Sequence, residues 1–242
     1  SKTATYKMLA NDVKSATLFI DNFEEFAGEW VIDAFEGSSS WVQTDVAAKS
    51  GIQSFFMFEE ATETDATLVS PAYEVVGTNP ALRIWHKFDT ETGADGGFIE
   101  ISSDGGNVWK IIRADEFIFN GYNSDLAYNT FAIPELKGFS GSSGSEFIDS
   151  YIDLAPYKGQ TVNFRFRFGT NASGVSEVDF RGWFIDDFEL MDLVVYETKA
   201  CVADQNNANG SCSVIKKIIM DSDGLVDTKD ELSNFDFNVY PN

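Results

Sequence analysis

The chain has 242 residues, of which 43% are hydrophobic and 14% aromatic, so it can bury a sizeable core and is not disordered throughout. Its 39 acidic residues outnumber the 17 basic ones and give a formal charge of −22, which excludes nucleic acid as an expected partner because both would be strongly negative. No run approaches the roughly 18 apolar residues that a membrane span needs, so we expect no membrane insertion.

Residues 1–17 are expected to form an entry segment, and the main domain to begin at residue 18. Beyond that point, segments rich in aromatic and β-branched residues predict strands. The clearest of these segments are 68–71, 81–88, 97–102 and 162–168. The last one alternates strictly between apolar residues (Val162, Phe164, Phe166, Phe168) and polar ones (Asn163, Arg165, Arg167). This alternation is typical of a strand with one buried face.

The segments between these strands are rich in Gly, Ser, Asp and Asn, as at 92–97 and 138–144, which is typical of turns and loops. No long segment shows a sustained period of about 3.6 residues. Many strands at short spacing, without alternating helices, predict an all-β fold: an antiparallel β-sandwich of jelly-roll type. We expect it to span residues 18–220, with a hairpin appendage at its C-terminal end.

One hairpin turn has a recognisable pattern. Ser102, Asp104, Gly106 and Trp109 have the spacing of an Asp-box, the turn motif that sialidases carry in several copies. This chain has one such box and no repeat, so we interpret it as a turn in which Asp104 binds backbone amides and Trp109 packs behind it.

The segment 182–190 (Gly-Trp-Phe-Ile-Asp-Asp-Phe-Glu-Leu) predicts a strand that carries three acidic residues among large apolar ones. Side chains alternate faces in a strand, so whichever face is buried, Asp186 or Asp187 lies beside large apolar neighbours. A buried carboxylate needs a cationic partner, and a hard cation such as Ca²⁺ takes oxygen ligands readily. We therefore predict a metal-stabilised β-domain; the alternative is that this end of the strand is simply hydrated.

The C-terminal part contains both cysteines. Cys201 and Cys212 flank a polar segment, 204–210, that predicts a loop between two strands. A disulfide between them would fit an exported protein and could contribute about 2–3 kcal/mol. The alternative is two reduced cysteines on neighbouring strands. Residues 221–234 are expected to form an acidic linker.

Several landmarks in order resemble secreted jelly-roll modules related to MAM domains, which are appended to bacterial metallopeptidases of the immune-inhibitor-A type and are akin to the cleaved adhesin domains of gingipains. The landmarks are the acidic segment 19–24, Trp30, Trp41, and the segments 65–71, 93–102, 103–109 and 182–190. The resemblance implies one calcium ion that ties the first strand to the last. The implied ligands are Asp21, Asn22 and Glu24 (or Glu25) from the front, Asp187 or Asp186 from the back, and Asp65 as a further candidate.

The last eight residues, 235–242 (Phe-Asp-Phe-Asn-Val-Tyr-Pro-Asn), resemble the opening of the C-terminal sorting domain that the type IX secretion system of Bacteroidetes reads. The given chain stops after this opening, so on this resemblance the sorting domain itself is missing, by truncation, processing or disorder. The resemblance implies a secreted or cell-surface protein whose partner during export is the type IX translocon. The alternative is an ordinary edge strand that ends at a proline turn.

The residues offer little catalytic chemistry. His86 is the only histidine, which argues against a Ser-His-Asp triad and against a zinc site built from several histidines. We interpret His86 as a structural residue on a strand. Candidate ligand-binding residues are the aromatic side chains Trp85, Trp109 and Tyr122, because pyranose rings stack on such surfaces, although core packing is the commoner fate of tryptophan.

The sequence therefore predicts a non-catalytic, calcium-stabilised module for adhesion or accessory binding within a larger exported protein, with a glycan or a surface protein as its ligand. The alternative is a carbohydrate-active enzyme of jelly-roll fold, a lyase or a glycoside hydrolase. Its 39 acidic residues make chance pairs of carboxylates unavoidable, and the sequence does not single out a catalytic pair.

Overall fold

The computed structural model describes most of the chain between residues 15 and 226. The described ranges are 15–25, 29–37, 40–126, 136–172, 181–202, 211–221 and 224–226. By its contacts the chain divides into a large unit, 17–192, and a second unit that joins 1–16 to 193–242. The sorting-domain motif at 235–242 and residues 222, 223 and 227–234 of the expected linker lie outside the described residues. The linker prediction was wrong for Asp221 and Gly224–Val226, which lie in strands.

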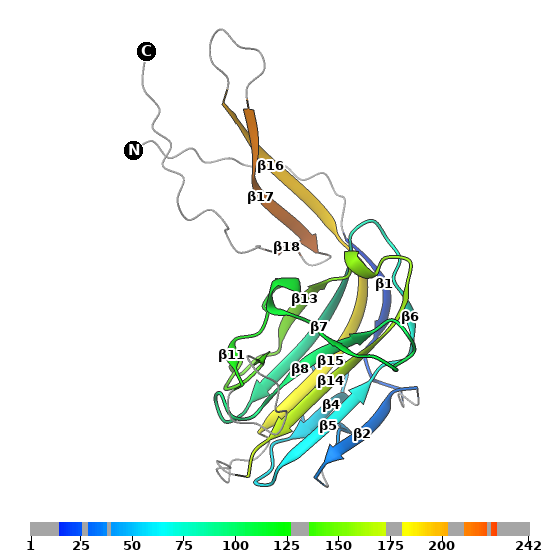
Figure 1. The fold of residues 1–242 in the computed structure, drawn as a ribbon, viewed down its shortest axis with the longest axis vertical. Helices are drawn as coiled ribbons and strands as arrows, with labels where there is room; N and C mark the ends of the chain where they lie inside the picture. The colour runs from blue at the N-terminus through cyan, green and yellow to red at the C-terminus, as the bar shows by residue number, and fades with distance from the viewer. Residues whose placement is uncertain are drawn as a thin grey trace, which may run out of the picture. The chain divides into compact units, whose positions relative to one another are not determined.

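The large unit consists of two antiparallel sheets (Figure 1). The first sheet runs β10 (Phe117–Phe119), β13 (Ile148–Asp153), β7 (Pro80–Asp89), β15 (Gly182–Asp192), β4 (Ser54–Phe58) and β3 (Val42–Thr44), with β1 (Ala16–Asp21) paired to β15. The second runs β2 (Val31–Glu36), β5 (Thr64–Val69), β14 (Thr161–Thr170), β8 (Gly96–Ser102) and β9 (Lys110–Ile111), with β6 (Tyr73–Glu74) paired to β14.

The remaining elements of this unit are short. They are the two-stranded pair β11 (Ser124–Asp125) and β12 (Lys137–Gly138), and the 3₁₀ turns η1 (Ala114–Glu116) and η2 (Ala155–Tyr157). Among the described residues, no helix is long and apolar enough to cross a membrane.

The strand pairing establishes the jelly roll. Along the chain, β4, β5, β7, β8, β13, β14 and β15 alternate between the two sheets. The pairs nest inside one another: β4 pairs with β15, β5 with β14, and β7 with β13, all antiparallel. A chain folded back on itself as one long hairpin and then wrapped into two sheets gives this order. The predicted fold class is therefore confirmed.

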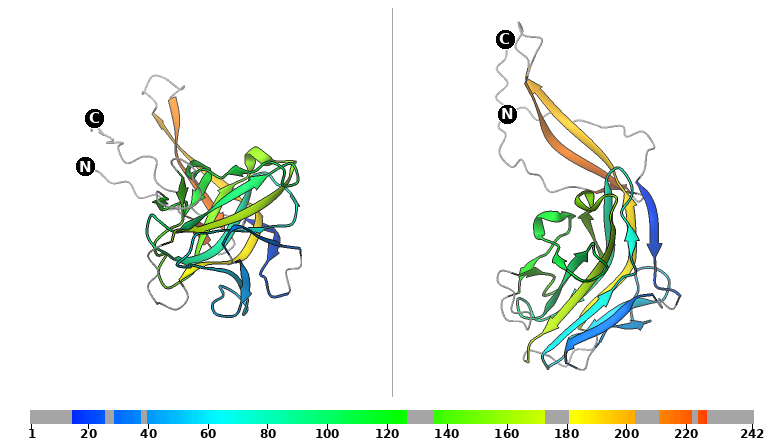
Figure 2. Two further views of the ribbon diagram at one scale, coloured as in Figure 1. Left: turned by 60° about the horizontal axis from the view of Figure 1, so that its bottom comes forward. Right: turned by 45° about the vertical axis from the view of Figure 1, so that its right-hand side comes forward.

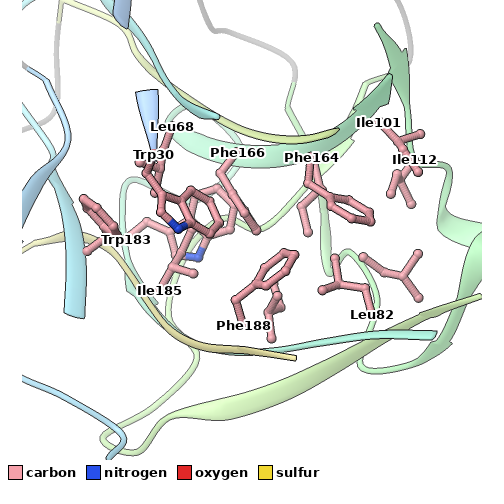
Figure 3. Close-up of a cluster of buried hydrophobic side chains, with 14 of the residues drawn as sticks. Trp30, Leu68, Leu82, Ile101, Ile112, Phe164, Phe166, Trp183, Ile185 and Phe188 are labelled. Carbon is pink, nitrogen blue, oxygen red and sulfur yellow. The ribbon is translucent and has the colours of Figure 1, made fainter. Parts of the chain in front are cut away.

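The core lies between the two sheets and is dominated by aromatic side chains. The predicted alternation of β14 is confirmed, because Val162, Phe164, Phe166 and Phe168 are all fully buried in it. Figure 3 shows Phe164 and Phe166 reaching toward Phe188 and Ile185 of the opposite sheet. The core also contains the tryptophans Trp30, Trp41 and Trp183. At about 25 cal/mol per Å² of apolar area, such rings supply most of the stabilisation.

The closing strand β15 does not alternate uniformly. Trp183 and Ile185 point into the core, and so do Phe188 and Leu190, so the phase changes between them. The register against β7 shifts between Asp186 and Glu189, which marks a β-bulge. Asp187 has a φ of +40°, a left-handed backbone conformation that few residues other than glycine adopt. Strict alternation was therefore the wrong expectation at this point, and the bulge places two consecutive carboxylates inside the fold.

The second unit contains the expected hairpin. Strands β16 (Val194–Val202) and β17 (Ser211–Asp221) pair antiparallel, as Figure 2 also shows. Strand β18 (Gly224–Val226) pairs with β17. The register places Cys201 directly opposite Cys212. Directly opposed residues of an antiparallel pair have Cα atoms about 4.5–5.5 Å apart, within the range that a disulfide needs. The disulfide remains a prediction.

Candidate functional site

The loop Lys49–Gln53, which leads into β4, receives carboxylates from two distant parts of the chain. Asp186 lies at the bulge of β15, and its Oδ2 accepts hydrogen bonds from the backbone amides of Lys49 (2.6 Å) and Ser50 (3.2 Å). Asp187 Oδ1 accepts a hydrogen bond from the Ser50 hydroxyl at 2.6 Å. Both carboxylates therefore face the same loop. The sequence left open whether Asp186 or Asp187 does so, and because of the bulge both do.

Glu24, which follows β1, contacts the other end of this loop. Its Oε1 accepts hydrogen bonds from the backbone amides of Ile52 and Gln53, both at 2.8 Å. The close approach depends on Gly51, which has a φ of +57° and no side chain; a Cβ at this position would lie 2.2 Å from the carboxyl carbon of Glu24. One loop therefore connects Glu24, just after β1, with Asp186 and Asp187 of β15.

Burial of these acids has an electrostatic consequence. Asp186 is fully buried and Asp187 nearly so. Burial raises the pKa of Asp186 to about 6, an increase that the backbone hydrogen bonds from Asp187 and Lys49 oppose and the charge of Asp187 reinforces. Removing a carboxylate from water disfavours its charged form. Ionised Asp186 and Asp187 therefore lower the stability of the fold unless a cation lies nearby.

The nearest amine does not neutralise the three acids of this site. Lys49 places its ammonium 3.6 Å from the centre of the Trp85 ring, in a cation–π contact. Within the described part of the chain, no Lys or Arg forms an ion pair with Glu24, Asp186 or Asp187. The oxygen atoms that meet at this loop come from carboxylates and the Ser50 hydroxyl, and oxygen is the ligand that Ca²⁺ prefers.

The other predicted metal ligands are placed differently. Asp21 closes the turn after β1, where its Oδ1 accepts from the Phe23 amide (3.0 Å) and its Oδ2 from the Trp30 indole (2.8 Å). Asn22 is exposed. Asp65 is not brought to the loop: on β5 it forms a two-bond ion pair with Arg167, at 2.7 and 2.5 Å.

In the described ranges, no three His, Cys, Asp or Glu side chains are placed so that they could hold a metal ion. A cation at the loop Lys49–Gln53 would therefore need backbone carbonyls or the Ser50 hydroxyl beside the carboxylates.

Of the three predicted ligand-binding aromatics, Trp109 lies on the outer face of the second sheet. The Arg165 guanidinium stacks 4.3 Å from the centre of its ring, and Arg165 Nε donates to Glu100 Oε2 at 2.5 Å. The exposed ring of Phe35 lies 5.1 Å from the guanidinium carbon of Arg167, which extends the row. We call these five residues the arginine–aromatic face: Phe35, Glu100, Trp109, Arg165 and Arg167.

The other two aromatics are engaged within the protein. Two cations lie over the ring of Trp85: the Lys49 ammonium, and the Arg83 guanidinium at 4.6 Å from the ring centre. The hydroxyl of Tyr122 accepts from the Ile99 amide (2.9 Å) and donates to the Ile99 carbonyl (3.3 Å), and burial raises its pKa. Neither side chain is brought together with Trp109 into one surface.

The Asp-box turn is formed as expected. Asp104 Oδ1 accepts hydrogen bonds from the Ser102 hydroxyl (2.7 Å) and from the amides of Asn107 (3.1 Å) and Val108 (2.9 Å). These bonds, that from Val108 first, lower the pKa of Asp104. The interpretation as a turn that fixes the hairpin before Trp109 is confirmed.

His86 has no contact with solvent. Its Nδ1 accepts from the Trp183 indole at 3.2 Å, and its Nε2 lies 2.8 Å from the Ser150 hydroxyl, which donates to the Asn120 carbonyl. Burial lowers the pKa of His86 to about 3, so the ring is neutral near pH 7. The interpretation of His86 as a structural residue is confirmed.

Sequence reasoning missed the loop Lys49–Gln53 and both arginines of the face. The strict alternation of β14 had placed Arg165 and Arg167 opposite the core, which was a usable signal for an exposed row. The loop gave no signal, because its contacts with Asp186 and Asp187 join residues 136 and 137 positions apart.

Comparison with known proteins gives only distant similarities. No protein-family model matches the sequence, and no curated protein does. Among solved structures, the K2 cleaved adhesin domain of Lys-gingipain is 20% identical, with a TM-score of 0.43 over 71% of this chain and 96% of that one. The module TmCBM61, solved with β-1,4-galactotriose, is 14% identical, with a TM-score of 0.42 over 70% and 92%. Similarities of this size carry no argument about function.

The contact between Gly51 and Glu24 can be tested by substitution. Gly51→Ala should destabilise the protein by more than the roughly 1–2 kcal/mol of a left-handed backbone, because Glu24 would lose its bonds to the loop. Chemical denaturation would measure this. Gly105→Ala is the matched control, since Gly105 has a φ of +73° and open space around it. Equal losses in the two variants would contradict the close approach.

Asp186 should also give a pH signature when divalent cations are chelated. Its folded-state pKa is raised, so the folded state binds the proton more tightly than the unfolded chain does. Its contribution to stability should therefore fall as the pH rises from about 4 to about 6 and then stay constant. Melting curves of the wild type and Asp186→Asn across this range should converge at low pH and separate above it. A constant difference would show that Asp186 does not titrate in this window.

Proposed function

We propose that this protein is a non-catalytic binding module, for adhesion or accessory binding, stabilised by calcium and belonging to a larger secreted or cell-surface protein. Its ligand is a glycan or a surface protein, and its partner during export is the type IX translocon. The export route rests on the motif at 235–242 alone. The observation that supports the binding role is the arginine–aromatic face, which presents ring surfaces and paired charges on a rigid sheet.

The face suits a sugar or a polar protein surface. Phe35 is 58% exposed and Trp109 is half-buried, so both offer apolar ring area. The ion pair between Arg165 and Glu100 fixes the guanidinium beside Trp109, so little side-chain entropy remains to be lost on binding. Rings for stacking, flanked by fixed hydrogen-bonding groups, are the usual components of a carbohydrate site.

The enzyme alternative lacks support in the site. An acid catalyst with a raised pKa should lie in a cleft that a substrate can enter. In the part of the chain that the structure describes, the carboxyl groups with raised pKa values are Asp95 and Asp186, and both side chains are fully buried. Glu100, an acid that could be imagined as catalytic, is bound to Arg165.

The calcium proposal predicts a conditional effect of Asp187→Ala. A ligand present at a hundred times its dissociation constant stabilises by about 2.7 kcal/mol, which corresponds to roughly 5–10 °C for a domain of this size. We expect Asp187→Ala to lose that increment in calcium and to lose little in chelator. Asp115→Ala, on an exposed acid, is the control and should behave like the wild type. Equal losses in both conditions would refute the calcium assignment.

The binding face can be tested on a glycan array followed by titration calorimetry with the best ligand. Trp109→Ala should weaken binding about tenfold or more, the equivalent of about 1.4 kcal/mol. Val108→Ala, on the exposed neighbour, should leave the affinity unchanged. An affinity that survives the loss of Trp109 would place the binding site elsewhere, and the absence of any glycan ligand would leave a protein surface as the partner to seek.

A further inference from the structure

Each arginine of the arginine–aromatic face is already paired with a carboxylate of a neighbouring strand. Arg165 Nε donates to Glu100 Oε2 at 2.5 Å, and Arg167 donates two hydrogen bonds to Asp65, at 2.7 and 2.5 Å. The hydrogen bond to Asp65 raises the pKa of Arg167, so this guanidinium stays charged. Both carboxylates are buried, so salt in the solvent screens these pairs little. The arginines therefore bring no unbalanced positive charge to the surface.

A third carboxylate lies on the same face. The strand pairing places Asp33 of β2 opposite Thr67 of β5, and Thr67 opposite Arg167 of β14. Directly opposed side chains point to the same side of a sheet, so Asp33, which is exposed, faces outward with the arginines. Two guanidinium groups thus share this face with three carboxylates, those of Asp33, Asp65 and Glu100, on a chain with a formal charge of −22.

The face nevertheless offers hydrogen-bond donors. Arg165 uses its Nε for the bond to Glu100. Its two terminal amino groups and the indole N–H of Trp109 have no hydrogen-bond partner within the described part of the chain, and none of these atoms is buried. The guanidinium lies 4.3 Å from the centre of the Trp109 ring, so these donors adjoin apolar ring area. Sugar hydroxyls accept hydrogen bonds from such donors, and the carbon atoms of a pyranose pack against such area.

We propose that the arginine–aromatic face binds a neutral glycan, one that carries no carboxylate or sulfate group. This inference rests on the binding role proposed above and names the class of its ligand. Neutral hydroxyl groups satisfy the donors without bringing charge to the face. An acidic glycan would bring negative charge to a face whose carboxylates already balance both guanidinium groups, on a protein that is strongly negative as a whole. The charges of the face therefore exclude acidic sugars.

Glu100 is a specificity-determining residue on this proposal. A guanidinium without a carboxylate partner binds a carboxylate through parallel hydrogen bonds. Removing the charge of Glu100 would leave Arg165 able to receive the carboxylate or sulfate of an acidic sugar. Arg167 would not gain this capacity in the same variant, because its two hydrogen bonds to Asp65 remain.

The test is titration calorimetry of the full chain with neutral polysaccharides (glucan, mannan and galactan) and acidic ones (hyaluronate and chondroitin sulfate), at one calcium concentration. The wild type should bind at least one neutral polysaccharide about tenfold more tightly than either acidic one. Raising NaCl from about 50 mM to about 500 mM should leave this affinity nearly unchanged, because no pair of charges forms on binding. Glu100→Gln should gain about tenfold in affinity for the acidic polysaccharides, and high salt should abolish the gain.

A matched control and a second variant complete the test. Glu146→Gln makes the same change at an exposed acid just before β13, in the other sheet, and should match the wild type in every titration. Asp33→Asn, at an exposed acid of the face, replaces Glu100→Gln if that variant does not fold, and should also gain affinity for the acidic polysaccharides.

The outcomes separate this inference from the proposed function. A wild type that prefers acidic polysaccharides, with an affinity that falls as salt rises, would refute the neutral ligand and leave the binding role intact. Binding of a neutral polysaccharide that survives Trp109→Ala would place the ligand on another surface. If no polysaccharide of either kind binds, both the inference and the glycan half of the proposed function are wrong. An unchanged affinity of Glu100→Gln for the acidic polysaccharides would refute the role of Glu100 in excluding them.

Discussion

Buried negative charge is the constraint on which this structure depends. The chain has 39 acidic and only 17 basic residues, and several carboxylates of the jelly roll are buried, Asp65, Glu100, Asp186 and Asp187 among them. Where an arginine is available, the structure uses it: Asp65 is paired with Arg167 and Glu100 with Arg165. These pairs are half-buried or deeper, so breaking one by removing a single partner would leave an uncompensated charge.

Two groups of acids remain without enough arginine, and each lies where the chain must be held together. The loop Lys49–Gln53 joins the first and last strands through backbone amides directed at Glu24 and Asp186. Glu59, Glu91 and Asp95 join the β7–β8 turn to the end of β4. Backbone amides stabilise carboxylates but carry no net charge, so they orient these groups without neutralising them. The proposed calcium ion at the loop would supply the positive charge that the amides there do not, and the raised pKa of Asp95 favours a proton in the second group.

The sequence predicted the fold because the signals for it are local. The alternation of β14 and the turn residues between strands depend on neighbours along the chain, and both were confirmed. The bulge at Asp186 was not predictable in this way, since the sequence around it is compatible with a plain strand and the bulge is fixed by pairing with β7. The candidate site was predicted in part. Glu24 and Asp187 contact the same loop, whereas Asp65 is paired with Arg167 and Asp21 accepts a hydrogen bond from the indole of Trp30. The sequence did not reveal the Asp65–Arg167 pair because the two residues are far apart along the chain.

A module stabilised in this way would couple its folding to its location. Calcium sites of extracellular modules have dissociation constants of about 10⁻⁴–10⁻³ M, so they stay largely empty where free calcium is scarce. Before export, the carboxylates of the loop site would repel one another and the chain would be less stable, a state compatible with passage through a translocon. Outside the cell, calcium would add its binding free energy to folding. On this proposal the folded state would be more stable outside the cell, where calcium is bound, than before export.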